Sequence, residues 1–547
     1  MPTHTPTPRV TVTGPPGDRH DEILTPEALE FLARLDRAFS RRRRELLTAR
    51  RDRADRLASG SPLDFPRATS AVRDDPHWRV APPAPGPADR RVELVTAPTA
   101  RAAAEALTSG APVWTADFGE TTGAPWADVV GGQLVLLDIS ALAGERHVPG
   151  RGLPSVMVRP RGWHLEEEHL TIDGRPLSAS LVDFGLYFFH CAERLVPTGA
   201  GPRFSLPELE SRYEARLWND VFLLAQDLLG VPHGSVRATA VIETVTAAFE
   251  MEEILYELRE HSAGLGADRW GYLFSLVRTF GHRARFLLPD RTDLTPTAPF
   301  LRAYDELLVR TCHRRGAHAI GGPTTPPPPG GAAPGTADRS RARAEREHEA
   351  RIGFDGSSVT DPGLVPLCAK VFDRHLSGRP HQIHRTLDSV RVRAEDLLTL
   401  HRTAPAPETE RVRADVALAL RYFDAWLRGT GTVAPDARPR GIDTVAPDAW
   451  LGGTGTVAPD ALLVDAAGAE LARARLWQWL RQRLVPQERL FGLIATEAAA
   501  LAAERPDALA AEARELLERS LVARELPALF TGEAPGHRFA LRTGVPS

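Results

Sequence analysis

The sequence predicts an α/β protein built on a (β/α)8 barrel of the TIM type, with an N-terminal helical arm and a C-terminal helical domain. Two observations favour this fold. The short apolar run at residues 240–242 ends on a single acid, Glu243, and a helical pattern follows it, as in the repeating unit of a parallel barrel. Similar runs alternate with helical patterns from residue 90 onward, over about the 250 residues that an eightfold barrel needs.

The first predicted element is a long helix over residues 25–58. Thr25 is a suitable N-terminal cap, Pro26 fits the first turn, and apolar residues recur every three or four positions. The run from Arg41 to Arg44 lies within this helix. A nucleic-acid contact and a solvated helix face both fit such a run, and the net charge of −4 favours the solvated face. A proline-rich spacer at residues 81–88 follows.

Candidate strands of the barrel lie at residues 113–116, 156–158, 240–242, 272–274 and 317–320. Several of these runs end on polar side chains, namely Asp117, Arg159 and Glu243. Helical patterns lie between the runs, at residues 208–229, 248–261 and 299–314. The glycine-rich segment 264–271 is expected to be a turn that leads into the strand at 272–274.

The last part of the chain is predicted to be helical. Residues 321–335, rich in proline and glycine, predict a loop, and a charged helix over residues 337–351 follows it. Past about residue 375 the strand signal fades, and a string at Trp426 recurs at Trp450 as a tandem duplication. We therefore expect an N-terminal tail and helical clasp at residues 1–88, a catalytic barrel at 89–375 and a C-terminal helical plug at 376–547.

The composition argues against several classes of protein. The net charge of −4 disfavours a general nucleic-acid or membrane-surface binder, and no stretch reaches the roughly 18 apolar residues of a membrane helix. Three cysteines, far apart in the sequence, exclude a disulfide scaffold. The first twenty residues lack an apolar secretory core and the C-terminus lacks a peroxisomal address, so we expect a cytoplasmic protein.

Some strings resemble known motifs but do not predict a binding site. Residues 429–434 and 453–458 fit the spacing of a dinucleotide-binding loop, but a proline follows each, so no helix begins there to bind a phosphate. His164 and His169 are five residues apart instead of the four of a zinc-protease helix. This string is expected to be a polar surface loop.

Arg159 and Glu243 are the strongest candidates for chemistry, because each closes a predicted strand. A strand-end arginine by itself fits a surface ion pair as well as an anion clamp. Glu243 by itself fits a structural acid at the start of the next helix or a ligand. If both lie at the mouth of one barrel, where barrel enzymes keep their catalytic groups, the functional interpretation gains weight.

Longer segments identify a family. These segments include VRPRGWHL, LVDFGLYFFH, EARLWNDVF, IETVTAAFEMEEILYELREHSAGL, TCHRRGAHAIGG and LWQWLR. Through them the chain resembles malate synthase of the A type over nearly its whole length. The resemblance implies an acyltransferase of the glyoxylate cycle that condenses acetyl-CoA with glyoxylate and hydrolyses the thioester to malate and CoA. It implies Mg²⁺ as cofactor and no nucleic-acid or membrane partner, and we expect a monomer or small homo-oligomer.

The family pattern also implies site residues. Arg159 stabilises the enolate of acetyl-CoA and binds substrate, and Glu243 is one Mg²⁺ ligand. These roles suit the chemistry, since a weakly acidic methyl group needs a base and enolate stabilisation, and Mg²⁺ takes oxygen ligands. The resemblance assigns the base to Asp465 and places Arg269 and Trp270 among the substrate-binding residues.

The chain departs from the family at its signature turn, which here reads GLGADRWGY. Gly271 stands where the family has its second Mg²⁺ ligand, an aspartate, and Asp268 stands at a glycine position. Either water fills the vacancy or Asp268 substitutes as the ligand. The expected function is malate synthase with activity weakened at this position. The alternative is a catalytically impaired malate synthase paralogue with a binding or vestigial role.

Overall fold

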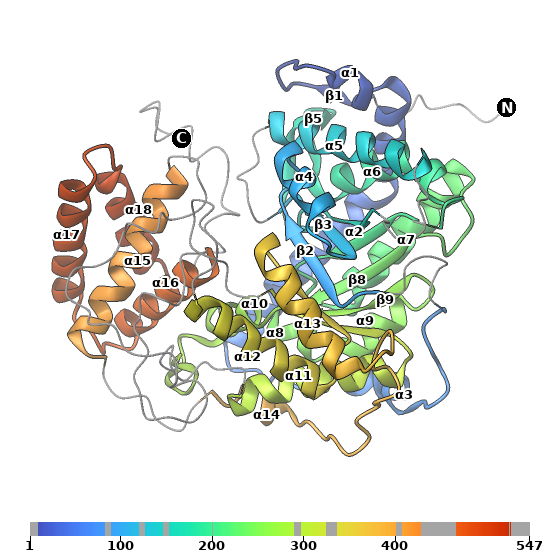
Figure 1. Cartoon of the computed structure of the whole chain (residues 1–547). Helices are drawn as coiled ribbons and strands as arrows, with labels where there is room; N and C mark the ends of the chain where they lie inside the picture. The colour runs from blue at the N-terminus through green and yellow to red at the C-terminus, as the bar shows by residue number, and fades with distance from the viewer. Residues whose placement is uncertain are drawn as a thin grey trace.

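The computed structural model describes residues 9–82, 89–119, 126–145, 153–199, 201–288, 297–323, 336–400, 407–427, 466–524 and 526. A closed barrel of parallel strands lies at its centre (Figure 1). In barrel order the strands are β2 Val92–Thr96, β3 Val113–Asp117, β4 Ser155–Arg159, β7 Arg203–Leu206, β8 Arg237–Ile242, β9 Ser262–Ala267, β10 His318–Gly321 and β11 Gly356–Val359. The predicted (β/α)8 barrel is therefore confirmed.

The strand predictions are confirmed for β3, β4, β8 and β10. The predicted strand at residues 272–274 is wrong, because these residues lie within helix α10, Arg269–Phe280. Tyr272 and Leu273 are fully buried there, so the aromatic run belongs to the inner face of a helix. The barrel strand is β9, in the segment that was expected to be a glycine-rich turn.

Gly264 shows why this strand is rich in glycine. Its φ is +136°, and a Cβ atom added there would lie 2.0 Å from the carbonyl oxygen of His318 on the neighbouring strand β10. Glycine tolerates both the conformation and the close approach. Such a strand offers no run of apolar side chains, so the apolar pattern did not reveal it. The strands β2, β7 and β11 were not predicted either.

The N-terminal helical arm is confirmed as α2, Pro26–Ala58. The amide of Ala28 donates a hydrogen bond of 3.2 Å to the side-chain oxygen of Thr25, which caps the helix. Buried residues of its apolar stripe, including Phe31 and Leu35, pack α2 against α6, Ala179–Leu195, and α7, Arg212–Leu229. The arm thus lies along the outside of the barrel instead of standing apart from it (Figure 1).

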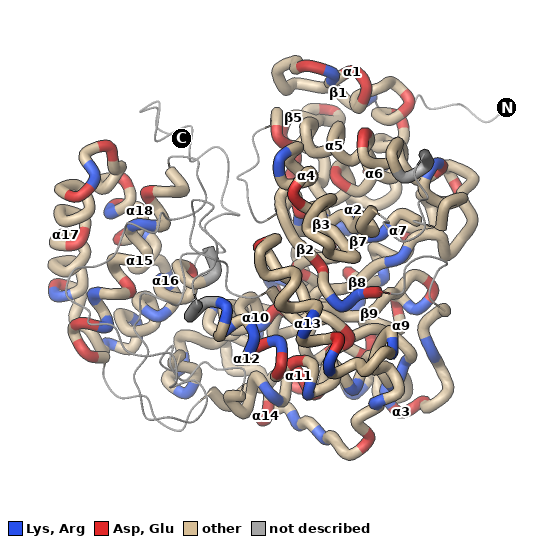
Figure 2. Tube along the Cα trace, in the orientation of Figure 1, with Lys and Arg blue, Asp and Glu red and all other residues tan. Residues whose placement is uncertain are grey.

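The arginine run within α2 is only partly the solvated face that was expected. The side chain of Arg41 is 86% exposed, whereas that of Arg43 is 5% exposed. Arg42 pairs with Asp220 of α7. In Figure 2, basic and acidic residues are interspersed along the helices around the barrel instead of gathering by sign. Arg42 and Arg43 therefore contact other parts of the protein, whereas Arg41 is solvated.

The other helices cover the barrel and join its strands. They are α1 His20–Ile23, α3 Ser70–Asp74, α4 Ala100–Thr108, α5 Trp126–Glu145, α8 Val245–Ala248, α9 Met251–Glu257, α11 Pro299–Arg314, α12 Thr336–Ile352, α13 Val365–Leu376 and α14 Ala394–Leu398. The predicted helix at 248–261 is shorter than expected, since the chain enters β9 at Ser262. None of the described helices is long and apolar enough to cross a membrane.

A small antiparallel sheet lies beside the barrel, formed by β1 Thr11–Val12, β5 Glu166–Ile172 and β6 Arg175–Ser178. Strand β5 includes His169, so the expectation of a surface loop at residues 164–169 is wrong over most of the string. The Nδ1 atom of His169 lies 2.8 Å from a carboxylate oxygen of Glu167 on the same strand. This histidine therefore has a structural partner.

The C-terminal helical domain is confirmed as α15 Thr409–Leu427, α16 Ala466–Arg481, α17 Gln487–Glu504 and α18 Ala510–Val522 (Figure 1). Helix α16 packs against α10, and the Gln478 side chain bonds to the backbone of Phe286 and Leu288 at 2.8 and 3.0 Å. The C-terminal unit is therefore fixed to the helix that begins at the signature turn. The predicted loop at 324–335 and the motif-like strings at 429–434 and 453–458 lie outside the described residues. So does the tandem duplication, except for Trp426 and Leu427 at the end of α15.

Candidate active site

The candidate site lies at the carboxyl ends of the barrel strands. Strand β3 ends at Asp117 and β4 at Arg159, while Glu243 follows β8 and Asp268 follows β9. In a parallel barrel these ends meet at one face, which is the face that carries the active site in TIM-barrel enzymes. The fold therefore brings together side chains that are up to 151 residues apart in the sequence, from position 117 to position 268.

Arg159 is placed between two carboxylates. One of its terminal nitrogens lies 3.2 Å from Glu243 Oε2 and 3.4 Å from Oε1, and the other lies 3.8 Å from Asp117 Oδ2. The three side chains are nearly buried, at 11%, 9% and 1% exposed. Interactions between opposite charges are stronger in such a site than in water. Arg159 and Glu243 therefore lie at one barrel mouth, as the sequence predicts, and the structure adds that they form an ion pair.

A third acid, Glu208, supports this pair and was not predicted as a site residue. It follows β7, and its backbone has a φ of +52°, which a residue other than glycine adopts only when its surroundings hold it. Its amide donates to Glu243 Oε1 at 2.5 Å. Its own carboxylate lies 2.9 Å from His164 Nδ1. Burial acts to raise the pKa of Glu208, but His164, Arg50 and Arg159 lower it to about 2, so the carboxylate is charged at neutral pH.

Asp268 is the N-terminal cap of α10. Its Oδ1 atom accepts hydrogen bonds from the amides of Trp270 and Gly271 at 3.0 and 2.9 Å. A Cβ atom added at Gly271 would lie 2.8 Å from Cβ of Glu243 and 3.0 Å from Oδ2 of Asp268. Position 271 therefore faces Glu243, and the second carboxylate oxygen of Asp268 lies where a side chain at 271 would begin.

Arg269 and Trp270, predicted to bind substrate, begin the same helix. The guanidinium of Arg269 is bound by Asp305 of α11 at 3.0–3.1 Å and by Glu349 of α12 at 2.8 Å. Burial raises the pKa of Asp305 to about 6, although Arg269 acts against this shift. Trp270 is half-buried and packs against the hydrophobic core. Both residues thus fasten the start of α10, and their substrate-binding role stays a prediction.

The remaining predicted residue, Asp465, lies outside the described residues. Helix α16 begins at the next position, Ala466, and packs against α10. The predicted role of Asp465 as the base is therefore neither supported nor contradicted by a contact.

The donor chemistry of the site fits Mg²⁺. Within the described part of the chain no group of three or more acidic, histidine or cysteine side chains is arranged to hold a metal ion. However, Mg²⁺ is commonly bound through one or two carboxylates and keeps several waters. Glu243 and Asp268 each supply a carboxylate at the carboxyl ends of neighbouring strands, and Oδ2 of Asp117 is buried with no hydrogen-bond partner among the described residues. Such oxygen donors are those that Mg²⁺ prefers.

Helix α2 holds two of the loops that form the site. Arg50 donates to the carbonyl oxygen of Glu208 at 2.7 Å and to the carboxylate of Glu214 at 2.7 Å. Arg43 donates to the carbonyl oxygens of Trp163 and Leu165 at 2.6 and 3.1 Å, in the loop that follows β4. The arm therefore fixes the backbone that follows β4 and the backbone that follows β7, next to the Arg159–Glu243 pair, and Arg50 is a positioning residue.

Replacing Arg50 by methionine is expected to lower turnover by about 10-fold, the smaller effect typical of residues that orient metal ligands. The change releases the carbonyl of Glu208, whose amide is bonded to Glu243. Steady-state kinetics with a Mg²⁺ titration measures the effect, and Arg41→Met on the exposed side of the same helix is the control. A loss of stability with unchanged turnover and Mg²⁺ requirement would show that Arg50 only anchors the arm.

Comparison with known proteins gives one family along most of the chain. The family models "Malate synthase, N-terminal domain", "Malate synthase, TIM barrel domain" and "Malate synthase, C-terminal" match residues 9–70, 155–400 and 442–534. Malate synthase of Streptomyces clavuligerus is 46% identical over 87% of this chain and 86% of its own length. Malate synthase of Myxococcus xanthus is 41% identical over 86% of this chain and 84% of its own.

A third relative is the glyoxysomal malate synthase of Candida tropicalis, 36% identical over 86% of this chain and 83% of its own. A Haloferax volcanii malate synthase pyruvate/acetyl-CoA ternary complex aligns with a TM-score of 0.44 and 17% identity over 78% of this chain and 96% of its own. The relatives favour an enzyme over the catalytically impaired paralogue considered as the alternative. With its domains in the family's order and its identity spread over most of its length, the chain belongs to the malate synthase family.

Proposed function

We propose that this chain catalyses the malate synthase reaction at the barrel mouth, with Arg159 as the group that stabilises the enolate. The reaction itself follows from membership of the family, whose relatives cover most of the chain. One observation carries the location: the guanidinium of Arg159 lies between Asp117 and Glu243 at three strand ends. A cation held there by two carboxylates is oriented before the substrate arrives, which is what electrostatic catalysis requires.

The proposed chemistry proceeds in three steps. Removal of a proton from the methyl group of acetyl-CoA leaves an enolate, whose negative charge lies on the thioester oxygen, and we assign this proton transfer to Asp465. The Arg159 guanidinium stabilises that charge. The enolate carbon then forms a bond to the aldehyde carbon of glyoxylate, and the aldehyde oxygen takes up a proton. Water finally cleaves the thioester, releasing malate and CoA.

We assign Mg²⁺ binding to Glu243 and Asp268. When bound, the ion supplies Lewis-acid polarisation of the glyoxylate carbonyl. Asp268 would replace the aspartate that the family has at position 271, because its Oδ2 atom lies 3.0 Å from the point where that side chain would begin. The cap of α10 uses Oδ1 to accept the hydrogen bonds from Trp270 and Gly271, so Oδ2 is the oxygen assigned to the metal. Water would complete the coordination.

The location in the cell and the oligomeric state are proposed from the sequence. We place the enzyme in the cytoplasm as a monomer or small homo-oligomer, acting on acetyl-CoA and glyoxylate. Some relatives, such as that of Glycine max, are named glyoxysomal, so cell fractionation with an activity assay is the measurement that checks this placement.

The proposed function is tested by following thiol release from acetyl-CoA with and without glyoxylate across a Mg²⁺ titration. We expect CoA release that requires both glyoxylate and Mg²⁺, with malate formed in equal amount. Absence of glyoxylate-dependent release at saturating Mg²⁺ would contradict the enzyme. Release without malate would indicate simple thioester hydrolysis instead.

Replacing Asp268 by asparagine is expected to raise the Mg²⁺ concentration for half-maximal activity by at least ~10-fold. Asparagine keeps an oxygen to accept from Trp270 and Gly271, so the cap of α10 is retained while the negative charge is lost. The matched control is Asp75→Asn, since Asp75 also accepts a backbone hydrogen bond, from His77 at 2.8 Å, in an exposed turn. An unchanged Mg²⁺ dependence in Asp268→Asn and in Asp268→Ala would remove Asp268 from the metal site.

A further inference from the structure

A tyrosine of helix α11 joins the carboxyl ends of strands β8 and β9, beside the site at the barrel mouth. The regular pairing of these strands ends at Ile242 and Ala267. The next residues are Glu243 and Asp268, the two acids assigned to Mg²⁺. The hydroxyl of Tyr304 donates a hydrogen bond to the carbonyl oxygen of Ile242 and accepts one of 3.2 Å from the amide of Asp268. None of the three steps of the proposed reaction uses this side chain.

The hydroxyl of Tyr304 supports a weak point of the strand pairing. The amide nitrogen of Asp268 lies 3.4 Å from the carbonyl oxygen of Ile242. This separation exceeds the range of about 2.7–3.2 Å that is usual for a hydrogen bond between an amide and a carbonyl group. Because the direct bond is weak, the two bonds of the hydroxyl supply much of the connection between these backbone groups. A side chain of α11 thus sets the spacing of the two strand ends that carry the acids.

The position of the hydroxyl is fixed by packing. Tyr304 is fully buried, and its ring stacks on that of Tyr272, with centroids 4.7 Å apart. Burial raises the pKa of Tyr304 well above its usual value, so the hydroxyl keeps the proton that it donates to Ile242. The next residue of α11, Asp305, binds the guanidinium of Arg269. Two consecutive residues of α11 therefore hold the N-terminal cap of α10 and the residue after it.

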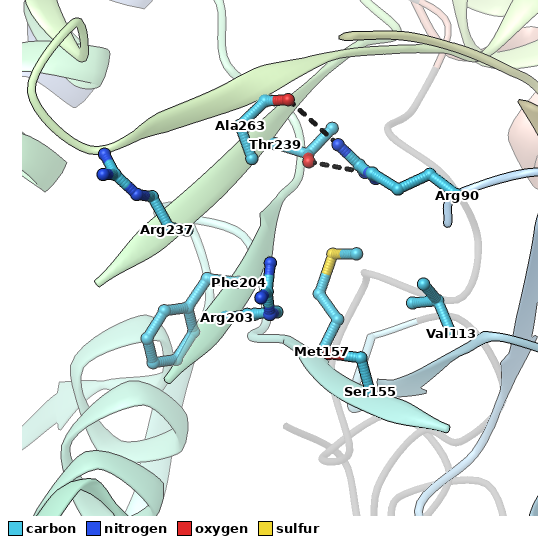
Figure 3. Close-up of a pocket in the computed structure, with 9 residues that line it drawn as sticks. All are labelled: Arg90, Val113, Ser155, Met157, Arg203, Phe204, Arg237, Thr239 and Ala263. Atoms are coloured by element: carbon cyan, nitrogen blue, oxygen red, sulfur yellow. Dashed lines mark hydrogen bonds between the residues drawn. The ribbon is translucent and has the colours of Figure 1, made fainter. Parts of the chain in front are cut away.

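The same two strands are joined independently towards their other end (Figure 3). Arg90 donates hydrogen bonds of 2.9 Å to the hydroxyl of Thr239 on β8 and to the carbonyl oxygen of Ala263 on β9. Removal of the Tyr304 hydroxyl therefore leaves the amino-terminal end of this strand pair in place. It loosens the end of the pair that carries the two acids.

We infer that Tyr304 is a positioning residue of the metal site, whose hydroxyl sets the placement of the Glu243 carboxylate relative to that of Asp268. The inference rests on the proposed function, in which these two acids bind Mg²⁺. Mg²⁺ requires nearly octahedral ligand geometry, so its affinity depends on where the two carboxylates lie. Since Tyr304 is fully buried, it acts through the backbone of the two strand ends and is not itself a catalytic residue.

Replacing Tyr304 by phenylalanine removes the hydroxyl and keeps the ring. The Mg²⁺ dissociation constant of the substrate-free full chain, measured by isothermal titration calorimetry, is expected to rise about 10-fold, as for other residues that orient metal ligands. Activity is expected to return toward the wild-type value at high Mg²⁺, with an unchanged KM for acetyl-CoA. Tyr272→Phe is the matched control, because it removes the other hydroxyl of the same ring pair, which donates to the carbonyl oxygen of Leu397 at 2.7 Å. Both variants are expected to lose stability, but only Tyr304→Phe is expected to lose Mg²⁺ affinity.

Equal Mg²⁺ affinities in Tyr304→Phe and Tyr272→Phe would overturn the inference. A second measurement uses the wild-type protein alone. In a crystal structure with Mg²⁺, we expect the hydroxyl to bond to Ile242 and Asp268 while the carboxylates of Glu243 and Asp268 bind the ion. An ion bound without one of these acids, or a hydroxyl bonded to neither backbone group, would also overturn it. Failure of the proposed function would appear differently, as a wild-type protein that releases no CoA in response to glyoxylate, whatever its Mg²⁺ affinity.

Discussion

Replacing Glu243 by glutamine is expected to lower kcat/KM for glyoxylate by at least ~100-fold, since even residues outside the first coordination shell of a metal contribute 10–100-fold. Glutamine keeps the size of the side chain but loses its charge. Glu243 now accepts hydrogen bonds from Arg159 and from the amide of Glu208. The neutral amide would weaken both of these interactions and would remove a carboxylate ligand proposed for Mg²⁺.

The measurement is steady-state kinetics over a Mg²⁺ titration, with circular dichroism as the check on folding. Glu193→Gln on α6 is the matched control, because Glu193 is exposed and lies away from the strand ends. A partial return of activity at high Mg²⁺ is expected in Glu243→Gln. Wild-type kinetics in this variant would show that Glu243 only supports the fold.

Replacing Arg159 by methionine is expected to lower kcat by about 10²–10³-fold, the range for loss of one donor to a developing oxyanion. The charge of Arg159 would be lost between Asp117 and Glu243, which then repel one another. Arg159→Lys keeps the charge but not the planar fork that reaches both carboxylates, so a partial rescue is expected.

Whether the substitution changes kcat or KM decides the role of Arg159. A fall in kcat with a modest change in KM for acetyl-CoA supports enolate stabilisation, because that charge exists only after proton removal. A rise in KM with unchanged kcat would instead assign Arg159 to substrate binding alone. Arg101→Met serves as the control, since its side chain is 86% exposed on α4 and contacts Glu105 only as a surface pair.

The N-terminal arm illustrates a contact that sequence reasoning cannot supply. The arginine run of α2 was interpreted as a solvated face from its charge pattern, which describes a helix in isolation. In the folded chain Arg43 and Arg50 meet backbone carbonyls more than 110 residues away in the sequence, at Trp163 and Glu208. A charge pattern along one helix does not reveal hydrogen-bond acceptors on another segment. The role of the arm could therefore be recognised only in the folded structure.

The signature turn shows a different limit. The sequence showed that Gly271 replaces an acid of the family pattern and that Asp268 is nearby. The backbone then placed Asp268 as a helix cap beside Glu243, with the space at position 271 already occupied. Asp268 can take the place of an acid at position 271 only if both positions lie on the same side of the helix. Whether they do depends on where the helix begins. The sequence predicted a turn and a strand where β9 and α10 lie, because β9 lacks an apolar run, so it did not provide the start of the helix.

The sequence by itself determined the barrel, both helical additions, the family and the strand-end residues Arg159 and Glu243, because local apolar patterns and long matched segments carry that information. The tertiary structure alone decided which charges meet. Glu208 was brought to Glu243 and Arg50 to Glu208, through the closure of the barrel and the docking of α2. Ion pairs and pockets depend on which strands and helices lie next to one another, and local sequence patterns do not specify this. The candidate residues could therefore be recognised in the sequence, whereas the contacts that support them could be recognised only in the folded structure.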